Sequence, residues 1–194
     1  MIKMKVREKT VAKNSIRNLT ISAIFIALAS GLSLIKIIQL PIGGSVTLLS
    51  MLPIIMIAYK LGLGWGVGSA FVYSLVQLAL GLANVLSWGL TPLSLAGTIF
   101  LDYILPFTGL GLAALFANGG DIKRIMGVVA VMVLRFLCHF VSGIIIFDIW
   151  CEWDNVWLYS LCYNGSYMLL ELVITAVSFA VLSRMPQIKR LMKA

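Results

Sequence analysis

The sequence predicts an all-α integral membrane protein built from six transmembrane helices. Of its 194 residues, 61% are hydrophobic and only 11% are charged, and the mean hydropathy is +1.04. Soluble domains carry about 25% charged residues. Transmembrane barrels alternate apolar and polar residues and seldom reach such a mean hydropathy. Because each helical span takes about 20 residues, the chain holds about six spans and has no room for a soluble catalytic domain.

Six hydrophobic stretches define these spans in order along the chain. They cover residues 19–38, 46–62, 65–82, 94–116, 126–147 and 159–182. This division predicts one transmembrane domain of residues 19–185, a basic cytoplasmic N-terminal segment of residues 1–18 and a basic cytoplasmic tail of residues 186–194. The N-terminal segment is open to two interpretations, an amphipathic helix on the inner leaflet or a solvated tail.

Basic residues alternate between the loops and predict the orientation. Lysines and arginines occur before the first span, after the second, after the fourth and after the last. The other loops hold none beyond Lys36, and the last of these loops carries Asp148, Glu152 and Asp154. The positive-inside rule therefore places both termini in the cytoplasm. The net charge of +8 is interpreted as this orientation signal and as attraction to anionic lipid, not to nucleic acid.

Four ionisable residues fall within the predicted spans, and each is costly in lipid and therefore a functional hypothesis. They are Asp102, Arg135, His139 and Glu171. Arg135 and Glu171 fall near mid-depth on the fifth and sixth spans, which favours a structural pair over a ligand role.

Asp102 and His139 show no obvious partner in the sequence. They lie in the outer half of their spans, as do Tyr159 and Asn164 on the sixth span. Polar faces on several spans cannot all face lipid, so we expect them to converge on a common interior. This group predicts a binding site that is open to the outside.

Small residues recur every four positions on the first span, at Ala23, Ala27 and Gly31. Such spacing lets another helix approach closely. The partner is either a helix of this chain or a separate membrane subunit, and the spacing alone leaves both open.

Motifs for catalysis and metal binding are absent. The chain has no GxxxxGK[ST] phosphate loop, no HExxH motif and no GxSxG elbow. The sequence therefore predicts no enzyme, no metal site and no cofactor. Cys151 and Cys162 flank the last outer loop, where a disulfide is conceivable, but free thiols are favoured because nothing else indicates a disulfide framework.

Several segments together resemble a known family. They are LPIGGSVTLLSMLPI (residues 40–54), LDYILPFTGLGLA (101–113), RFLCHFVSGIIIF (135–147) and WLYSLCYNGSYM (157–168). Over residues 19–185 the chain resembles the thiamine-binding S components of energy-coupling factor (ECF) vitamin transporters, the ThiT type. The resemblance implies a six-helix bundle in the bacterial plasma membrane with a vitamin site near the outer face. It also implies a transmembrane coupling subunit and two ATPase subunits as partners, with the coupling subunit docking on Ala23 and Ala27.

The resemblance also implies the ligand residues. The family's binding positions fall on Asp102, Tyr103, His139, Phe147, Tyr159 and Asn164. Phe147 stands where some members have a tryptophan, and the first outer loop lacks the tryptophan of other members, so Trp150, Trp153 or Trp157 is expected to complete the wall. The residue types suit thiamine, because a carboxylate balances its thiazolium and aromatic faces attract a cation.

The sequence therefore predicts a thiamine-binding S component, with residues 39–45 as a gate because Gly43 and Gly44 permit large backbone changes. Three alternatives remain: an S component for another vitamin, a stand-alone proton-coupled thiamine carrier that uses Asp102 or Glu171, and an intramembrane enzyme. The lack of an evident nucleophile argues against the last.

Overall fold

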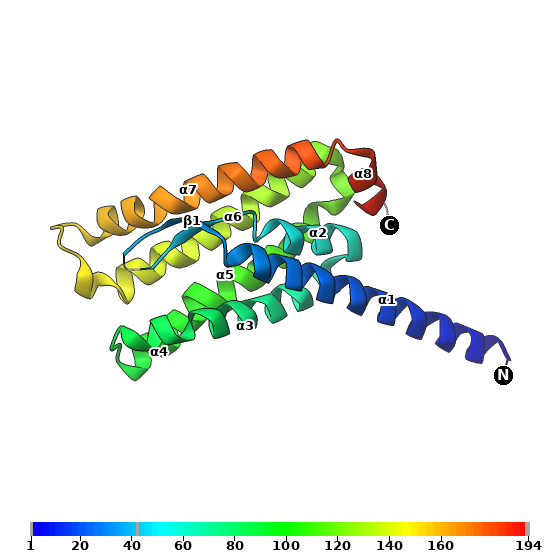
Figure 1. The fold of residues 1–194 in the computed structure, drawn as a ribbon, viewed down its shortest axis with the longest axis horizontal. Helices are drawn as coiled ribbons and strands as arrows, with labels where there is room; N and C mark the ends of the chain where they lie inside the picture. The colour runs from blue at the N-terminus through cyan, green and yellow to red at the C-terminus, as the bar shows by residue number, and fades with distance from the viewer. Residues whose placement is uncertain (1, 42, 193–194) are drawn as a thin grey trace.

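The computed structural model describes residues 2–41 and 43–192. Its helices and strands follow in the order α1 (Ile2–Ser33), β1 (Lys36–Gln39), β2 (Ser45–Thr47), α2 (Leu52–Leu61), α3 (Leu63–Ser87), α4 (Pro92–Thr98), η1 (Ile99–Ile104), α5 (Leu105–Thr108), η2 (Gly109–Gly119), α6 (Gly120–Ile145), η3 (Asp148–Trp150), α7 (Val156–Leu182) and α8 (Pro186–Met192). Figure 1 shows the long helices packed side by side in a bundle.

Both terminal segments are helical where the structure describes them. The N-terminal segment continues into the first span, so α1 has 32 residues and a length of about 48 Å, against about 30 Å for a hydrocarbon core. Figure 1 shows the start of α1 projecting beyond the other helices. The predicted tail forms α8, which packs against α2 with Met192 buried. The last two residues of that tail lie outside the described residues.

The predicted end of the first span is wrong. Helix α1 stops at Ser33, and residues 36–38, which the prediction placed in the helix, belong to strand β1. Strand β1 pairs antiparallel with β2, with Lys36 opposite Thr47 and Gln39 opposite Ser45. The segment KIIQ is only four residues long, which is too short for its hydrophobic periodicity to distinguish a helix from a strand.

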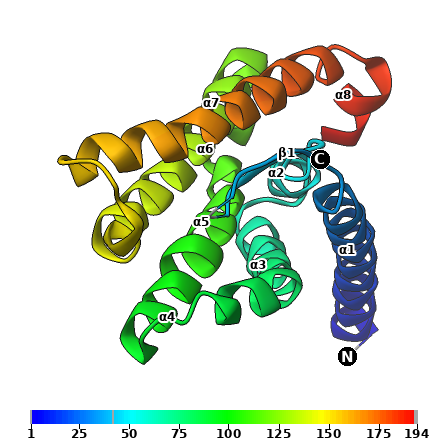
Figure 2. The ribbon, with the colours of Figure 1, turned by 60° about the vertical axis from the view of Figure 1, so that its left-hand side comes forward.

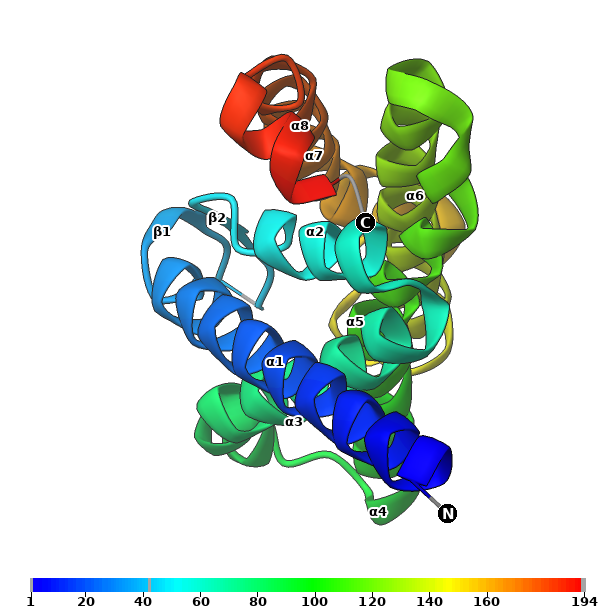
Figure 3. The same ribbon diagram turned by 90° about the vertical axis from the view of Figure 1, so that its right-hand side faces the viewer.

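The predicted second span is also wrong as a membrane-length helix. Its first residues form β2, and the helix that follows, α2, has ten residues and a length of about 15 Å. Pro53 lies in the first turn of α2. The N–H groups of a first turn have no partner within the helix, so a proline there costs no hydrogen bond. Helix α2 is instead the centre of the core, with Ile54, Ile55 and Ala58 fully buried. It packs against η2, α3 and α1, and Figure 3 shows it between α1 and α8.

The other predicted spans correspond to helices with shifted ends. Among the described residues, four stretches are long and apolar enough to cross a membrane: Asn14–Ser33, Leu63–Ser87, Pro92–Ile145 and Val156–Leu182. The third stretch covers two predicted spans, because the chain turns back at Gly120, whose φ of 75° favours glycine. Helix α6 then packs against η2 and α7.

The first half of that stretch, residues 92–119, changes helix type along its length. It runs from α4 into a π-helical segment at Ile99–Ile104, then into α5 and the 3₁₀ segment η2. Pro106 has no N–H to donate to the carbonyl of Asp102 four residues earlier, which disfavours regular α-helical bonding there. A π turn carries an additional residue and is often found at functional sites. This wide turn carries Asp102 and Tyr103.

Candidate functional site

A cavity of about 390 Å³ lies at the end of the bundle that the charge pattern predicts to face outward. It lies between α1 and α3 on one side and α6 and α7 on the other, and Figure 2 shows the β1–β2 hairpin running across this space. Its volume falls in the usual range for small-molecule sites, about 300–1,000 Å³. All six residues expected to contact the ligand line it, namely Asp102, Tyr103, His139, Phe147, Tyr159 and Asn164.

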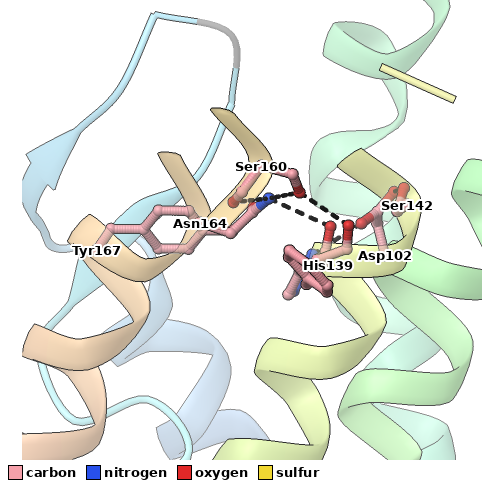
Figure 4. Close-up of polar contacts among 7 residues, drawn as sticks. Asp102, His139, Ser142, Ser160, Asn164 and Tyr167 are labelled. Carbon is pink, nitrogen blue, oxygen red and sulfur yellow. Dashed lines mark hydrogen bonds and ion pairs between the residues drawn. The ribbon is translucent and has the colours of Figure 1, made fainter. Parts of the chain in front are cut away.

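Asp102 and His139, for which the sequence shows no obvious partner, are partners of each other. His139 Nδ1 lies 2.7 Å from Asp102 Oδ1, and Ser142 Oγ donates to Asp102 Oδ2 over 2.5 Å. Figure 4 shows the three side chains meeting between η1 and α6. Because an ionised carboxylate only accepts, the hydrogen-bond network assigns the proton to Nδ1. Nε2 has no protein partner in the part of the chain described, and it accepts a hydrogen bond when the ring is neutral.

Asn164 is held on α7 by bonds at both ends of its amide. Its Nδ2 donates to Ser160 O over 3.1 Å and to His139 O over 3.2 Å, and its Oδ1 accepts from Tyr167 over 3.1 Å. Gly143 allows the close approach of α6 and α7 here, since a Cβ at this position would clash with Ser160 and Asn164. The amide is therefore set in one orientation at the cavity wall.

Three aromatic side chains form one wall of the cavity. Phe147 and Trp150 are stacked with ring centroids 5.4 Å apart, and Trp88 meets both rings edge-on, at 5.4 Å and 6.1 Å. All three residues line the cavity. Aromatic faces arranged in this way attract a cation, and more strongly when it is desolvated.

The three candidate tryptophans of the last outer segment have different positions. Trp150 lines the cavity, whereas Trp153 packs edge-on against Tyr159 with centroids 5.8 Å apart. Trp157 packs against Phe140 and is 62% exposed. Trp150 therefore joins Phe147 and Trp88 in the wall.

Arg135 and Glu171 meet below the cavity. Arg135 Nη1 lies 2.6 Å from Glu171 Oε2, and both residues are buried, at 6% and 2% exposure. The guanidinium also lies 4.8 Å from the centre of the Phe107 ring. Arg135 and Phe107 line the cavity, so this ion pair joins α6 to α7 directly beneath the site.

The segment expected to be a gate lies over the cavity as the turn of the β1–β2 hairpin. Gly43 and Gly44 line the cavity and have φ values of 94° and 83°, which favour glycine. The hydroxyl of Tyr163 donates to Gly43 O over 2.8 Å. Ile42, in the middle of this segment, lies outside the described residues.

The site offers the chemistry of binding and not of bond cleavage. Ser142 donates to Asp102 and not to His139, so the three residues do not form an activated nucleophile. Among the described residues there is no cluster of three or more metal-ligating side chains, and the three cysteines are free. A partly buried carboxylate, an imidazole nitrogen without a protein partner, an oriented amide and aromatic faces together suit a small organic cation.

A family model described as thiamine transporter protein matches residues 19–190. The chain belongs to the thiamine transporter family. It is 30% identical over 177 residues to the thiamine transporter ThiT of Bacillus subtilis strain 168, covering 84% of this chain and 85% of that protein. It is 28% identical over 148 residues to ThiT of Lacticaseibacillus paracasei, covering 68% and 70%.

The fold of this thiamine transporter family member is shared with a solved structure. ThiT from Listeria monocytogenes superposes with a TM-score of 0.74 at 21% identity, over 92% of this chain and 98% of that one. The family and the fold confirm an all-α membrane protein, and a bacterial membrane is its expected location. Since the named relatives are transporters, the non-enzymatic role is confirmed as well. The number of spans and their orientation stay predictions.

Sequence reasoning missed three residues of this transporter's site. Ser142 lies three positions after His139 on the same helix face, so helical spacing was a usable signal for it. Tyr163 lies four positions after Tyr159 and was detectable in the same way. Trp88 carried no signal, because it follows a helix that extends five residues past the predicted end of its span.

Proposed function

We propose that this chain is the substrate-binding S component of an ECF-type importer and that it binds thiamine in the cavity. The observation that carries the proposal is a carboxylate, Asp102, set beside an aromatic wall in a cavity of about 390 Å³. Thiamine combines a permanent thiazolium cation with an aminopyrimidine that donates and accepts hydrogen bonds. The named relatives are thiamine transporters, which supports the choice of ligand.

Each polar group of the site has a role in this proposal. The Asp102 carboxylate balances the cationic ligand, because a charge-assisted contact is strong where water is excluded. The aromatic wall of Trp88, Phe147 and Trp150 attracts the thiazolium. His139 Nε2 and the free lone pair of Asn164 Oδ1 supply acceptors for the amino group of the aminopyrimidine, because both protons of the Asn164 NH₂ group are used within the protein.

Transport then depends on partner subunits. The chain carries no phosphate loop of its own, so ATP hydrolysis must come from two ATPase subunits that act through a transmembrane coupling subunit. Helix α1 supports this proposal, because Ala23 and Ala27 are exposed on it while Ala29 is fully buried against the bundle. The exposed face with alanines four residues apart is where we place the coupling subunit.

Calorimetry of the purified protein in detergent tests the ligand. We expect thiamine to bind and a hydrophobic uncharged vitamin of similar size not to compete. Mass spectrometry of small molecules that co-purify with the protein identifies a different vitamin if thiamine is wrong. Uptake in cells with and without the coupling and ATPase subunits tests the partnership, since a stand-alone carrier would transport thiamine without them.

Replacing both Ala23 and Ala27 by tryptophan tests the docking face. The large side chains block close helix approach, so the coupling subunit should no longer co-purify while thiamine binding by the isolated protein is retained. Ala79 and Ala83, also exposed and four residues apart on α3, provide a matched control pair. Tryptophans there should leave the complex intact. Loss of thiamine binding with an intact complex would show that the α1 face packs against the site instead.

A further inference from the structure

Gly81 lies in the interior of α3, although the backbone there does not require a glycine. Its φ is not positive, so its helical conformation is open to any residue that carries a side chain. A glycine inside a helix lowers the stability of that helix relative to alanine. The reason for a glycine at this position therefore lies outside the helix, in the side chain that contacts it.

That side chain is Tyr103, which comes from the π-helical segment η1. A Cβ built on Gly81 would overlap the hydroxyl oxygen of Tyr103 and would lie 3.0 Å from the ring carbons Cε1 and Cζ. The optimal separation of two non-bonded carbon atoms is about 3.5–4.0 Å. The tyrosine ring thus lies directly against the backbone of α3, in the space that a side chain at position 81 would occupy.

The π turn directs two neighbouring residues to different helices. Asp102 bonds to His139 and Ser142 on α6, whereas Tyr103 contacts α3 at Gly81. Both Gly81 and Tyr103 line the cavity, as Asp102 does. Because the ring of Tyr103 lies against α3, the space beside the Asp102 carboxylate is left to the ligand.

We infer that Gly81 is a positioning residue: it lets Tyr103 lie against α3 and thereby keeps the cavity open for a ligand with two linked rings. A methyl group at position 81 pushes the tyrosine hydroxyl away from α3. Tyr103 also packs against the hydrophobic core, which is close-packed and takes no added volume, so the hydroxyl moves into the cavity. The ligand then binds only by forcing the ring back against the methyl group. This inference rests on the proposed binding of thiamine.

Gly81→Ala tests this role in titration calorimetry with thiamine. Overpacking of this kind changes an equilibrium constant by about 5- to 150-fold, and we expect the Kd for thiamine to rise by such a factor. Gly68→Ala is the matched control on the same helix, because a Cβ at Gly68 would extend into open space and Gly68 does not line the cavity. The Kd of this control should stay within about twofold of the original.

Tyr103→Phe provides the rescue, because it removes the hydroxyl oxygen that the added Cβ would overlap. Gly81→Ala should therefore raise the Kd far less in the Tyr103→Phe background than in the original protein. An equal rise in both backgrounds would show that the methyl group blocks the ligand itself, which would overturn the inference. An unchanged Kd in Gly81→Ala alone would overturn it as well.

Thermal melting without ligand separates this inference from the proposed function. Alanine is the better helix former, so the gain in melting temperature from Gly68→Ala shows the effect of such a replacement where there is space. Gly81→Ala should gain less than this in the original protein and should approach it in the Tyr103→Phe background.

If thiamine does not bind but this melting pattern is found, the function is wrong and the positioning of Tyr103 by Gly81 stands. Without the pattern, the inference is wrong whatever the ligand is. If Gly81→Ala alone does not fold, recovery of folded protein in the double variant supports the inference, and failure of that recovery contradicts it.

Discussion

Asp102→Asn removes the charge of the cavity carboxylate while keeping its size. In the structure, both oxygens of Asp102 accept hydrogen bonds, one from His139 and one from Ser142. An asparagine has one accepting oxygen, so it satisfies only one of these donors and turns an NH₂ group toward the other. If that other donor is His139 Nδ1, the imidazole must move its proton to Nε2 and lose its acceptor at the cavity.

The expected weakening follows from the loss of charge. A hydrogen bond to a charged group contributes about 1.5–3 kcal/mol, which multiplies the Kd for thiamine by about 10- to 150-fold. Ser142→Ala keeps the carboxylate and its charge and removes only a donor that orients it, so its effect on the Kd should be smaller than that of Asp102→Asn. Comparing the Kd values of the two variants therefore shows whether the charge of Asp102 or its orientation contributes more to thiamine binding.

Titration calorimetry in detergent measures both variants, and thermal melting without ligand shows whether each is folded. Asp148→Asn is the matched control, because Asp148 is exposed at the same end of the protein and does not line the cavity. Its Kd should be close to that of the original protein. A folded Asp102→Asn protein that binds thiamine with unchanged Kd would refute the reasoning, as would an equal loss in Asp148→Asn.

Two further predictions concern the floor and the wall of the site. Arg135→Ala and Glu171→Ala should each cost about 3–5 kcal/mol of folding stability because the remaining charge is left buried, and the double variant should cost less than the sum. Folded yield and melting temperature in detergent measure this, and purely additive losses would contradict a coupled pair. Trp150→Ala should weaken thiamine binding by about 0.5–2 kcal/mol, whereas Trp157→Ala, outside the cavity, should not change the Kd measured by calorimetry. Equal effects of the two would show that the wall has been misplaced.

The amino-acid sequence by itself determined the class of the protein and the residues around its cavity. Hydropathy reports the average surroundings of each short stretch, so it located the membrane-length helices within a few residues. The cost of ionisable groups in lipid singled out Asp102 and His139 before any contact was known. Position on the sixth span added Tyr159 and Asn164, and the resemblance supplied Tyr103 and Phe147. All six line one cavity.

Only the tertiary structure decided which of these residues touch. His139 and Asp102 are 37 positions apart, and Thr47 and Glu171 are 124 apart. Contacts over such separations depend on the rotation, tilt and depth of each helix, and a period of 3.6 residues specifies none of the three. Tertiary packing also determines the π turn that carries Asp102. It determines as well the β1–β2 hairpin, which replaces the end of the first predicted span and the start of the second. Hydropathy is an average over a window of residues and does not detect either feature.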